Sequence, residues 1–168
     1  IIAHVDHGKT TLVDGLLKQG GIYRDNQAIT ERVMDSNDLE KERGITILAK
    51  NTAIHYKDVK INVIDTPGYL DFTGEVAQAL RVADSAVILV DGKAGIEVGT
   101  ELAWDMAESA NLPRAFFINK CDDPDARFKH VFQQLHDKFG STICPVVIPL
   151  MTGDKIVGLL DLVDMRAR

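Results

Sequence analysis

The stretch AHVDHGKT at residues 3–10 decides the fold of this chain, because a glycine-containing turn is followed by the Lys-Thr pair of a phosphate-binding loop. A short apolar strand precedes it at residues 1–3, and apolar residues recur at helical spacing over residues 12–17. The start of a helix presents backbone N–H groups and a positive dipole end to an anion. The first glycine that is usual in such loops is Ala3 here, so the match taken alone is moderately specific.

The residue types of this loop suit a nucleoside triphosphate. Lys9 would reach the outer phosphates, and Thr10 would place its hydroxyl on a Mg²⁺ that bridges the β- and γ-phosphates. Gly8 allows the backbone to approach where a Cβ would intrude. The middle positions of such loops usually point outward, which we expect of both histidines. The nucleotide-binding residues expected here are Ala3, His4, Val5, Asp6, His7, Gly8, Lys9, Thr10 and Thr11.

A second motif, DTPG at residues 65–68, follows the apolar run at residues 61–64. It therefore lies at the carboxyl end of a strand, where doubly wound sheets bind ligands. Asp65 can hold a water on Mg²⁺, and Gly68 can offer its N–H to the γ-phosphate and move when that phosphate leaves. The residues expected to bind nucleotide here are Asp65, Thr66, Pro67, Gly68 and Tyr69.

A third motif, NKCD at residues 119–122, follows the apolar run at residues 115–118. The carboxylate of Asp122 can accept hydrogen bonds from N1–H and N2–H₂ of guanine, whereas adenine would present an acceptor at N1. A buried polar mismatch of that kind supports rejection by up to about 10⁴-fold. The sequence thus predicts a guanine nucleotide held by Asn119, Lys120 and Asp122.

The order of elements predicts an α/β fold, with a mostly parallel doubly wound sheet and one antiparallel edge strand. Apolar runs predict strands at residues 47–56, 61–65, 86–90, 115–118, 146–150 and 156–163. Helical spacing predicts helices through Val76, Leu80 and Ala83, over residues 101–110, and over 125–139 with Gly140 as its cap. The polar stretch at residues 20–42 has no strong period, and Trp104, Phe116 and Phe117 are expected in the core.

Composition favours an ordinary globular domain. The 168 residues are 45% apolar and 26% charged with a net charge of −6, which argues against independent nucleic-acid binding. There is no run of 18 apolar residues and no signal-like start, so neither a membrane span nor export is expected. Cys121 and Cys144 lack metal-type spacing, which favours thiols in a reducing, cytoplasmic compartment.

A fourth stretch, RGITI at residues 43–47, makes a family visible. Together with the three motifs above, it resembles the translational GTPases, the group that contains elongation factors Tu and G and the BipA-type factors. The resemblance implies a P-loop G domain that binds GTP or GDP with Mg²⁺. It also implies that residues 20–42 correspond to switch one, and that Thr46 is the switch-one threonine that binds Mg²⁺ only in the GTP state. By the same resemblance Val5 and Ile45 form an apolar gate beside the attacking water, with plain core packing as the alternative.

The two parts of the chain resemble different members of this family. Residues 1–57 resemble BipA (also called TypA), whereas the sequence from Ile61 onward is closer to a divergent branch of elongation factor G. Either one branch shares features of both, or the sequence joins two genes.

Tyr69 stands where most of the family has a histidine that acts on the attacking water. Orienting that water is worth roughly 10² to 10⁴ in rate. A phenol can still hydrogen bond to the water but is a poor base near neutral pH. The catalytic residues expected are Tyr69, in a positioning role, with Lys9 and Thr46.

The resemblance also implies a domain organisation. Residues 1–144 would be a partial G domain, and residues 145–168 would begin the inserted β-rich subdomain of elongation factor G. The Ser-Ala loop that faces guanine in this family is not in the sequence, which also starts mid-strand, so we expect a fragment that is incomplete at both ends.

Three functions remain open from the sequence. The main one is an elongation factor G-like GTPase that acts in translocation, monomeric and stimulated by the ribosome. The second is a BipA-type GTPase that acts in ribosome assembly or stress. The third is a nucleotide-gated ribosome-binding module in which Tyr69 has largely abolished hydrolysis.

Overall fold

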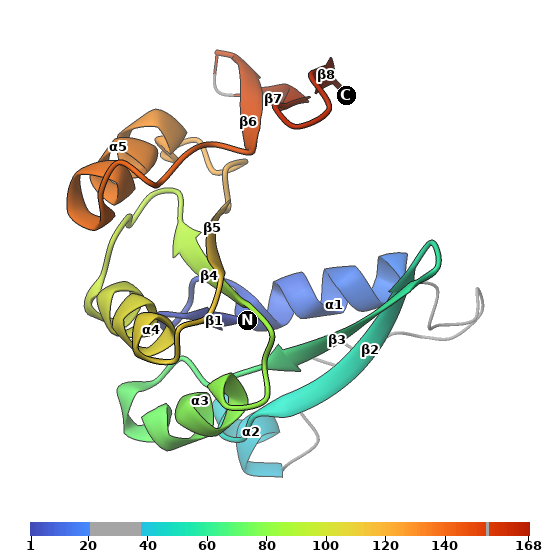
Figure 1. The fold of residues 1–168 in the computed structure, drawn as a ribbon, viewed down its shortest axis with the longest axis vertical. Coiled ribbons are helices and arrows are strands. Elements are labelled where there is room, and N and C mark those ends of the chain that lie inside the picture. Colours follow the sequence, from blue (N-terminus) through green and yellow to red (C-terminus); the bar gives the residue numbers. More distant parts are fainter. Residues whose placement is uncertain (21–37, 154) are drawn as a thin grey trace. The chain divides into compact units, whose positions relative to one another are not determined.

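The computed structural model describes residues 1–20, 38–153 and 155–168 (Figure 1). Two compact units make up the chain. The first comprises Ile1–Leu89 and Val98–Phe117, and the second comprises Val90–Glu97 and Ile118–Arg168. These units do not test the predicted boundary at residue 145, which stays a prediction.

The first unit is built on parallel strands that carry near-continuous apolar sequence. Strand β1 (Ile2–Ala3) pairs in parallel with β4 (Ala86–Asp91), and β5 (Arg114–Asn119) completes a sheet of order β1-β4-β5. Helices α3 (Thr73–Leu80) and α4 (Val98–Ser109) contact each other, and α4 also contacts β1. The core they enclose consists of Ile2, Val76, Leu80, Ala86, Ile88, Ala103 and Ala107. This confirms the predicted α/β class with parallel strands.

Strands β2 (Lys50–Tyr56) and β3 (Val59–Asp65) form an antiparallel hairpin, which Figure 1 shows as a long ribbon. They make a two-stranded sheet of their own, whereas we expected an antiparallel edge strand in the main sheet. Helix α1 (Lys9–Gln19) contacts β3 and shares a second apolar cluster with the hairpin. That cluster consists of Val13, Leu17, Ile54 and Val63.

Strand β2 begins three residues later than the predicted start at Ile47. The reason is local, because the backbone N–H groups of Ile47, Leu48 and Ala49 donate to glutamate side chains instead of to a neighbouring strand. The first of these glutamates lies in a short helix, α2 (Asp38–Arg43), within a stretch expected to be irregular. The rest of that expectation, residues 21–37, lies outside the described residues.

In the second unit, helix α5 (Phe128–Phe139) buries Val131 and Leu135 and begins three residues after the predicted start. Gly140 caps it at φ 98°, and its N–H donates to the His136 carbonyl at 2.9 Å. Strands β6 (Val147–Thr152), β7 (Lys155–Asp161) and β8 (Arg166–Ala167) form an antiparallel sheet, which confirms the two strands predicted after residue 145.

One core prediction is wrong. Phe117 is 42% exposed, since side chains alternate between the two faces of β5 and only one face is covered. Its neighbour Phe116 stacks on Trp104 with ring centroids 5.2 Å apart, and the Arg114 guanidinium lies 3.9 Å from the centroid of the same indole.

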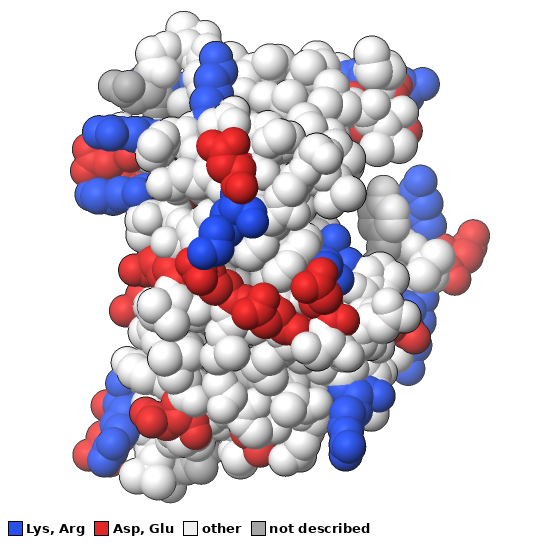
Figure 2. Space-filling view, turned by 60° about the vertical axis from the view of Figure 1, so that its left-hand side comes forward, with Lys and Arg blue, Asp and Glu red and all other residues white. Residues whose placement is uncertain are grey.

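Acidic and basic side chains are intermixed on the face drawn in Figure 2, with broad uncharged areas between them. This distribution agrees with a modest net charge of −6. Among the described residues, no helix is both long and apolar enough to cross a membrane.

Candidate functional site

The loop between β1 and α1 contains two residues with positive φ angles, Asp6 at 62° and Gly8 at 90°. Left-handed residues of this kind are typical of loops whose backbone N–H groups bind anions. Gly8 ends the loop, and its carbonyl accepts from the Leu12 N–H at 2.9 Å, so α1 begins directly after it. Ala3 is buried as the last residue of β1, and Thr11 is exposed on α1.

The two histidines of the loop hold its rear side. His7 is only 2% exposed, and its Nδ1 lies 3.2 Å from the Leu89 carbonyl of β4. His4 accepts from the Gly99 N–H at 3.3 Å, and its ring meets that of His7 edge to face. The expectation that both point outward is therefore wrong for His7, because a ring nitrogen can satisfy a carbonyl at the sheet end. Both residues fix the loop to β4 and α4.

Lys9 and Gly68 face each other across a narrow space. A Cβ built on Gly68 would lie 2.5 Å from Lys9 Nζ and 3.3 Å from Val5 Cα. The Asp65–Gly68 loop thus lies against the phosphate loop with the lysine ammonium between them. Lys9 is 7% exposed, and its pKa is lowered by burial, against the opposing effects of Asp65 and Asp6. A buried ammonium that has lost its hydration is suited to an anionic ligand.

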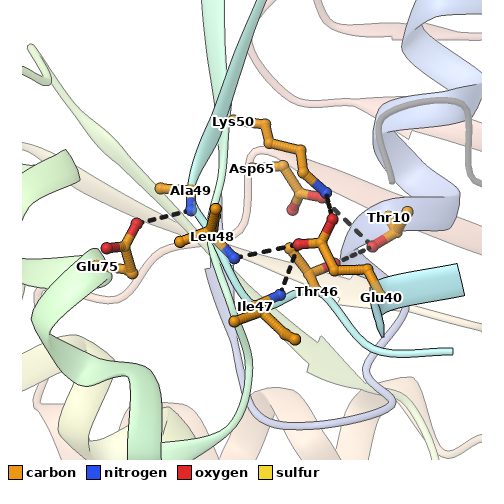
Figure 3. Close-up of polar contacts among 9 residues, drawn as sticks. All are labelled: Thr10, Glu40, Thr46, Ile47, Leu48, Ala49, Lys50, Asp65 and Glu75. Atoms are coloured by element: carbon orange, nitrogen blue, oxygen red, sulfur yellow. Dashed lines mark hydrogen bonds and ion pairs between the residues drawn. The ribbon is translucent and has the colours of Figure 1, made fainter. Parts of the chain in front are cut away.

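Three side-chain oxygens from separate segments converge at the start of α1 (Figure 3). Thr10 Oγ1 lies 3.2 Å from Thr46 Oγ1 and donates to Asp65 Oδ2 at 3.3 Å. Asp65 is fully buried at the end of β3, and Thr46 is 6% exposed. Two hydroxyls and a carboxylate form the oxygen donor set that Mg²⁺ prefers, so these residues fit the implied metal.

The rest of the second motif is packed in place. Thr66 and Pro67 are buried, and the Thr66 hydroxyl donates to the Ile1 carbonyl at 2.9 Å. Tyr69 is 38% exposed and lies immediately before the 3₁₀ helix η1 (Leu70–Phe72). Its side chain is therefore accessible from solvent.

The third motif belongs to the second unit and is organised around Asp91. Lys120, at φ 54°, places its Nζ 2.8 Å from Asp91 Oδ2. The Asp91 carboxylate also accepts from the Lys93 and Ala94 N–H groups. Burial opposes its ionisation, but these partners outweigh burial and lower the pKa of Asp91 to about 2.

The remaining members of this motif lie at the end of β5. The Asn119 carbonyl accepts from the Gly92 N–H at 2.8 Å, which joins the motif to the turn after β4. Asp122 is exposed, and the Cys121 thiol between them donates to the Ile118 carbonyl at 3.3 Å.

The structure thus brings together the predicted phosphate and metal residues within the first unit, and the predicted guanine residues within the second. Sequence reasoning missed Glu40, Lys50, Glu75 and Asp91. Asp91 directly follows an apolar run and is the last residue of the buried strand β4, the same signal that identified Asp65 and Asn119. The run LEKER at residues 39–43 was interpreted as part of an irregular polar stretch, which concealed the buried Glu40.

Comparison with known proteins gives a consistent result. The model of the elongation factor Tu GTP binding domain family matches residues 1–167. The large ribosomal subunit assembly factor BipA of Bacillus subtilis is 52% identical over 139 residues, which are 83% of this chain and 23% of that protein. BipA of Escherichia coli K12 has the same identity and coverage.

A crystal structure of a Thermus thermophilus protein superposes with a TM-score of 0.89 at 33% identity, over 99% of this chain and 25% of that one. The chain spans about a quarter of the length of the relatives it matches. Because the BipA alignments extend over 139 residues, the similarity to BipA continues well past residue 57. The sequence-based division into a BipA-like first third and an elongation factor G-like remainder is not supported.

Proposed function

Because this chain belongs to the elongation factor Tu GTP-binding domain family of translational GTPases, we propose that it is the GTP-hydrolysing switch of a BipA-type factor that acts on the ribosome. The observation that carries this proposal is the convergence of the Thr46 and Asp65 side chains on Thr10, directly after Lys9 at the start of α1. By resemblance, Thr46 belongs to the segment that responds to nucleotide in this family, and its contact with Thr10 at 3.2 Å supports a role for it in a GTP-dependent switch.

Each residue of the phosphate site has a distinct role in this proposal. The backbone N–H groups of the phosphate loop and of the first turn of α1 hold the β-phosphate. Lys9 bridges the β- and γ-phosphates, and the Gly68 N–H donates to the γ-phosphate. Val5 and Ile45 exclude bulk water from the site, while the Tyr69 hydroxyl orients the attacking water. Tyr69 is a positioning group here because a phenol is a weak base near neutral pH.

Thr10 and Thr46 would hold Mg²⁺ directly and Asp65 through a water, and the metal would neutralise charge that develops on the β- and γ-phosphate oxygens. Hydrolysis removes the γ-phosphate, so the contacts that would hold Thr46 and Gly68 at the site are lost. Both segments then relax, so hydrolysis changes the conformation of the surface that these segments form. Asn119 and Asp122 would select guanine, with Lys120 held by Asp91.

Identity of 52% to two assembly factors favours a role in large-subunit assembly over translocation. A second candidate, the elongation factor G-like role, is favoured by one feature. Antiparallel strands β6 to β8 follow residue 145, where the resemblance to elongation factor G predicts the start of a β-rich subdomain.

The test is to delete the gene and separate the ribosomal particles of the deletion strain on sucrose gradients. A BipA-type role predicts accumulation of precursors of the large subunit, whereas a role in translocation predicts mature subunits and slow peptide elongation. The same purified protein should hydrolyse GTP faster when ribosomes are added. Ribosome binding that depends on GTP without faster hydrolysis would instead identify a nucleotide-gated binding module.

A further inference from the structure

Glu40 is the most buried acidic side chain that the roles above leave unused. Its side chain has 0% exposure, although it belongs to a six-residue helix whose sequence is almost entirely charged. Its Oε2 lies 2.5 Å from Lys50 Nζ, and Lys50 is itself only 13% exposed. A carboxylate is removed from water in this way only where other groups replace its hydration.

The other oxygen of this carboxylate accepts hydrogen bonds from the backbone of the two residues that follow Thr46. Glu40 Oε1 accepts from the Ile47 N–H at 2.8 Å and from the Leu48 N–H at 3.1 Å. The backbone carbonyl of Glu40 accepts from the Ile45 N–H at 3.2 Å. The residues immediately before and after Thr46 are therefore both bonded to Glu40.

The consequence for Thr46 is visible in Figure 3, where Glu40 lies between Lys50 and the Ile47–Leu48 backbone while Thr46 points to Thr10. Thr46 Oγ1 reaches Thr10 Oγ1 at 3.2 Å. After Leu48, the Ala49 N–H donates to Glu75 Oε2 at 2.9 Å, which links the residues that follow Thr46 to α3.

We propose that Glu40, neutralised by Lys50, is a positioning residue that holds Thr46 at the phosphate site and so favours the triphosphate over the diphosphate state. The inference rests on the proposed function, since it assigns Glu40 a role in the same nucleotide switch. Glu40 does not touch the nucleotide. It contributes by reducing the conformations open to residues 45–48, so that Thr46 loses little freedom when GTP binds.

The first experiment compares affinities for GTPγS and GDP in the intact protein that carries this chain. Glu40→Gln keeps the side-chain shape but turns an amide N–H₂ toward the Lys50 ammonium. We expect the ratio of GTPγS to GDP affinity to fall about tenfold, with GDP affinity within about threefold of the parent. Glu42→Gln, an equal charge change at an exposed position of the same helix, should leave both affinities unchanged.

A double variant separates the positioning role from general damage. Glu40→Gln with Lys50→Met removes both charges, and the glutamine Oε1 can still accept from the Ile47 and Leu48 N–H groups. The ratio should therefore recover to within about threefold of the parent. An unchanged ratio in Glu40→Gln, or an equal loss of GDP and GTPγS affinity, would overturn the inference.

A measurement on the unsubstituted protein keeps the proposal testable if the variants do not fold. Amide hydrogen exchange of Ile47 and Leu48 should be at least tenfold slower with GTPγS than with GDP. Equal exchange in the two states would overturn the inference, whereas binding of both guanine nucleotides would still support the proposed nucleotide site. If the parent binds neither nucleotide, the proposed function fails and this inference fails with it.

Discussion

Replacing Gly68 by alanine should separate the binding of GTP from that of GDP. The added Cβ would lie 2.5 Å from Lys9 Nζ, and an ordinary contact needs at least 3.4 Å, so the ammonium must retreat by roughly 0.9 Å. A charge-assisted hydrogen bond of about 2.8 Å does not survive such a displacement. Bonds of that type contribute about 1.5–3 kcal/mol, which corresponds to roughly ten- to one-hundred-fold in affinity.

The loss should fall mainly on the triphosphate, because Gly68 belongs to the loop that faces the γ-phosphate position. We expect GTPγS affinity to fall at least five times more than GDP affinity, measured by titration calorimetry. The fold should persist, since the closest atom is the flexible end of a side chain, although Val5 Cα at 3.3 Å must also yield slightly. The melting temperature should change by less than about 3 °C.

Gly74→Ala is the matched control for this substitution. Gly74 lies in α3, and a Cβ there would meet nothing within 4 Å. Alanine should therefore stabilise the helix by up to about 1 kcal/mol and leave both affinities unchanged. If Gly68→Ala binds GTPγS as tightly as Gly74→Ala does, the placement of Lys9 at the γ-phosphate is wrong.

Three further predictions concern the second unit. Because the pKa of Asp91 is lowered to about 2, its ionised form stabilises the fold above the unfolded-state value of 3.8, and this contribution is lost as the pH falls toward 2. Lys120 is 43% exposed, which reduces the expected contribution of the ion pair to about 1–2 kcal/mol. In urea unfolding at pH 7, Asp91→Asn should therefore have a free energy of unfolding lower than that of the parent by this amount. The difference between the two proteins should shrink below pH 4. Burial, Asp122 and Asp91 raise the pKa of the half-buried Cys121 thiol, whereas Cys144 is exposed. Cys144→Ser, which keeps only Cys121, should therefore react with an aromatic disulfide reagent at least about tenfold more slowly than Cys121→Ser, which keeps only Cys144. Equal rates would contradict the described packing. Asp122→Asn should lower GDP affinity by roughly 10²-fold and raise affinity for xanthosine diphosphate, whose C2 carbonyl can accept from an amide; unchanged base preference in competition binding would remove Asp122 from the base site.

The parts of the fold that the sequence predicted are those where a local pattern and its environment agree. Asp65 and Asn119 each follow a run of apolar residues, so their positions at the ends of β3 and β5 could be predicted from those runs. The turn at Gly8 could likewise be predicted, because a phosphate loop needs a residue that accepts positive φ. These signals depend on neighbours along the chain.

Other features depend on contacts that sequence patterns do not encode. Glu40 is buried because Lys50 and two backbone amides surround it, whereas its own helix has no apolar face to announce burial. His7 faces inward because its ring nitrogen can pair with the Leu89 carbonyl of β4. Phe117 is exposed because one face of β5 is uncovered, which a run of four apolar residues does not reveal. In each case a partner distant in sequence decides the outcome.

The most direct test of the central claim is equilibrium binding of GDP, GTPγS and ATPγS to the purified intact protein, with and without Mg²⁺. The account predicts that both guanine nucleotides bind, that ATPγS binds at least about 10³-fold more weakly, and that Mg²⁺ strengthens GTPγS binding through Thr10, Thr46 and Asp65. Thr46→Ala should lose that Mg²⁺ effect for GTPγS while still binding GDP. Equal binding of adenine and guanine nucleotides, or binding of neither, would contradict a GTP-dependent switch.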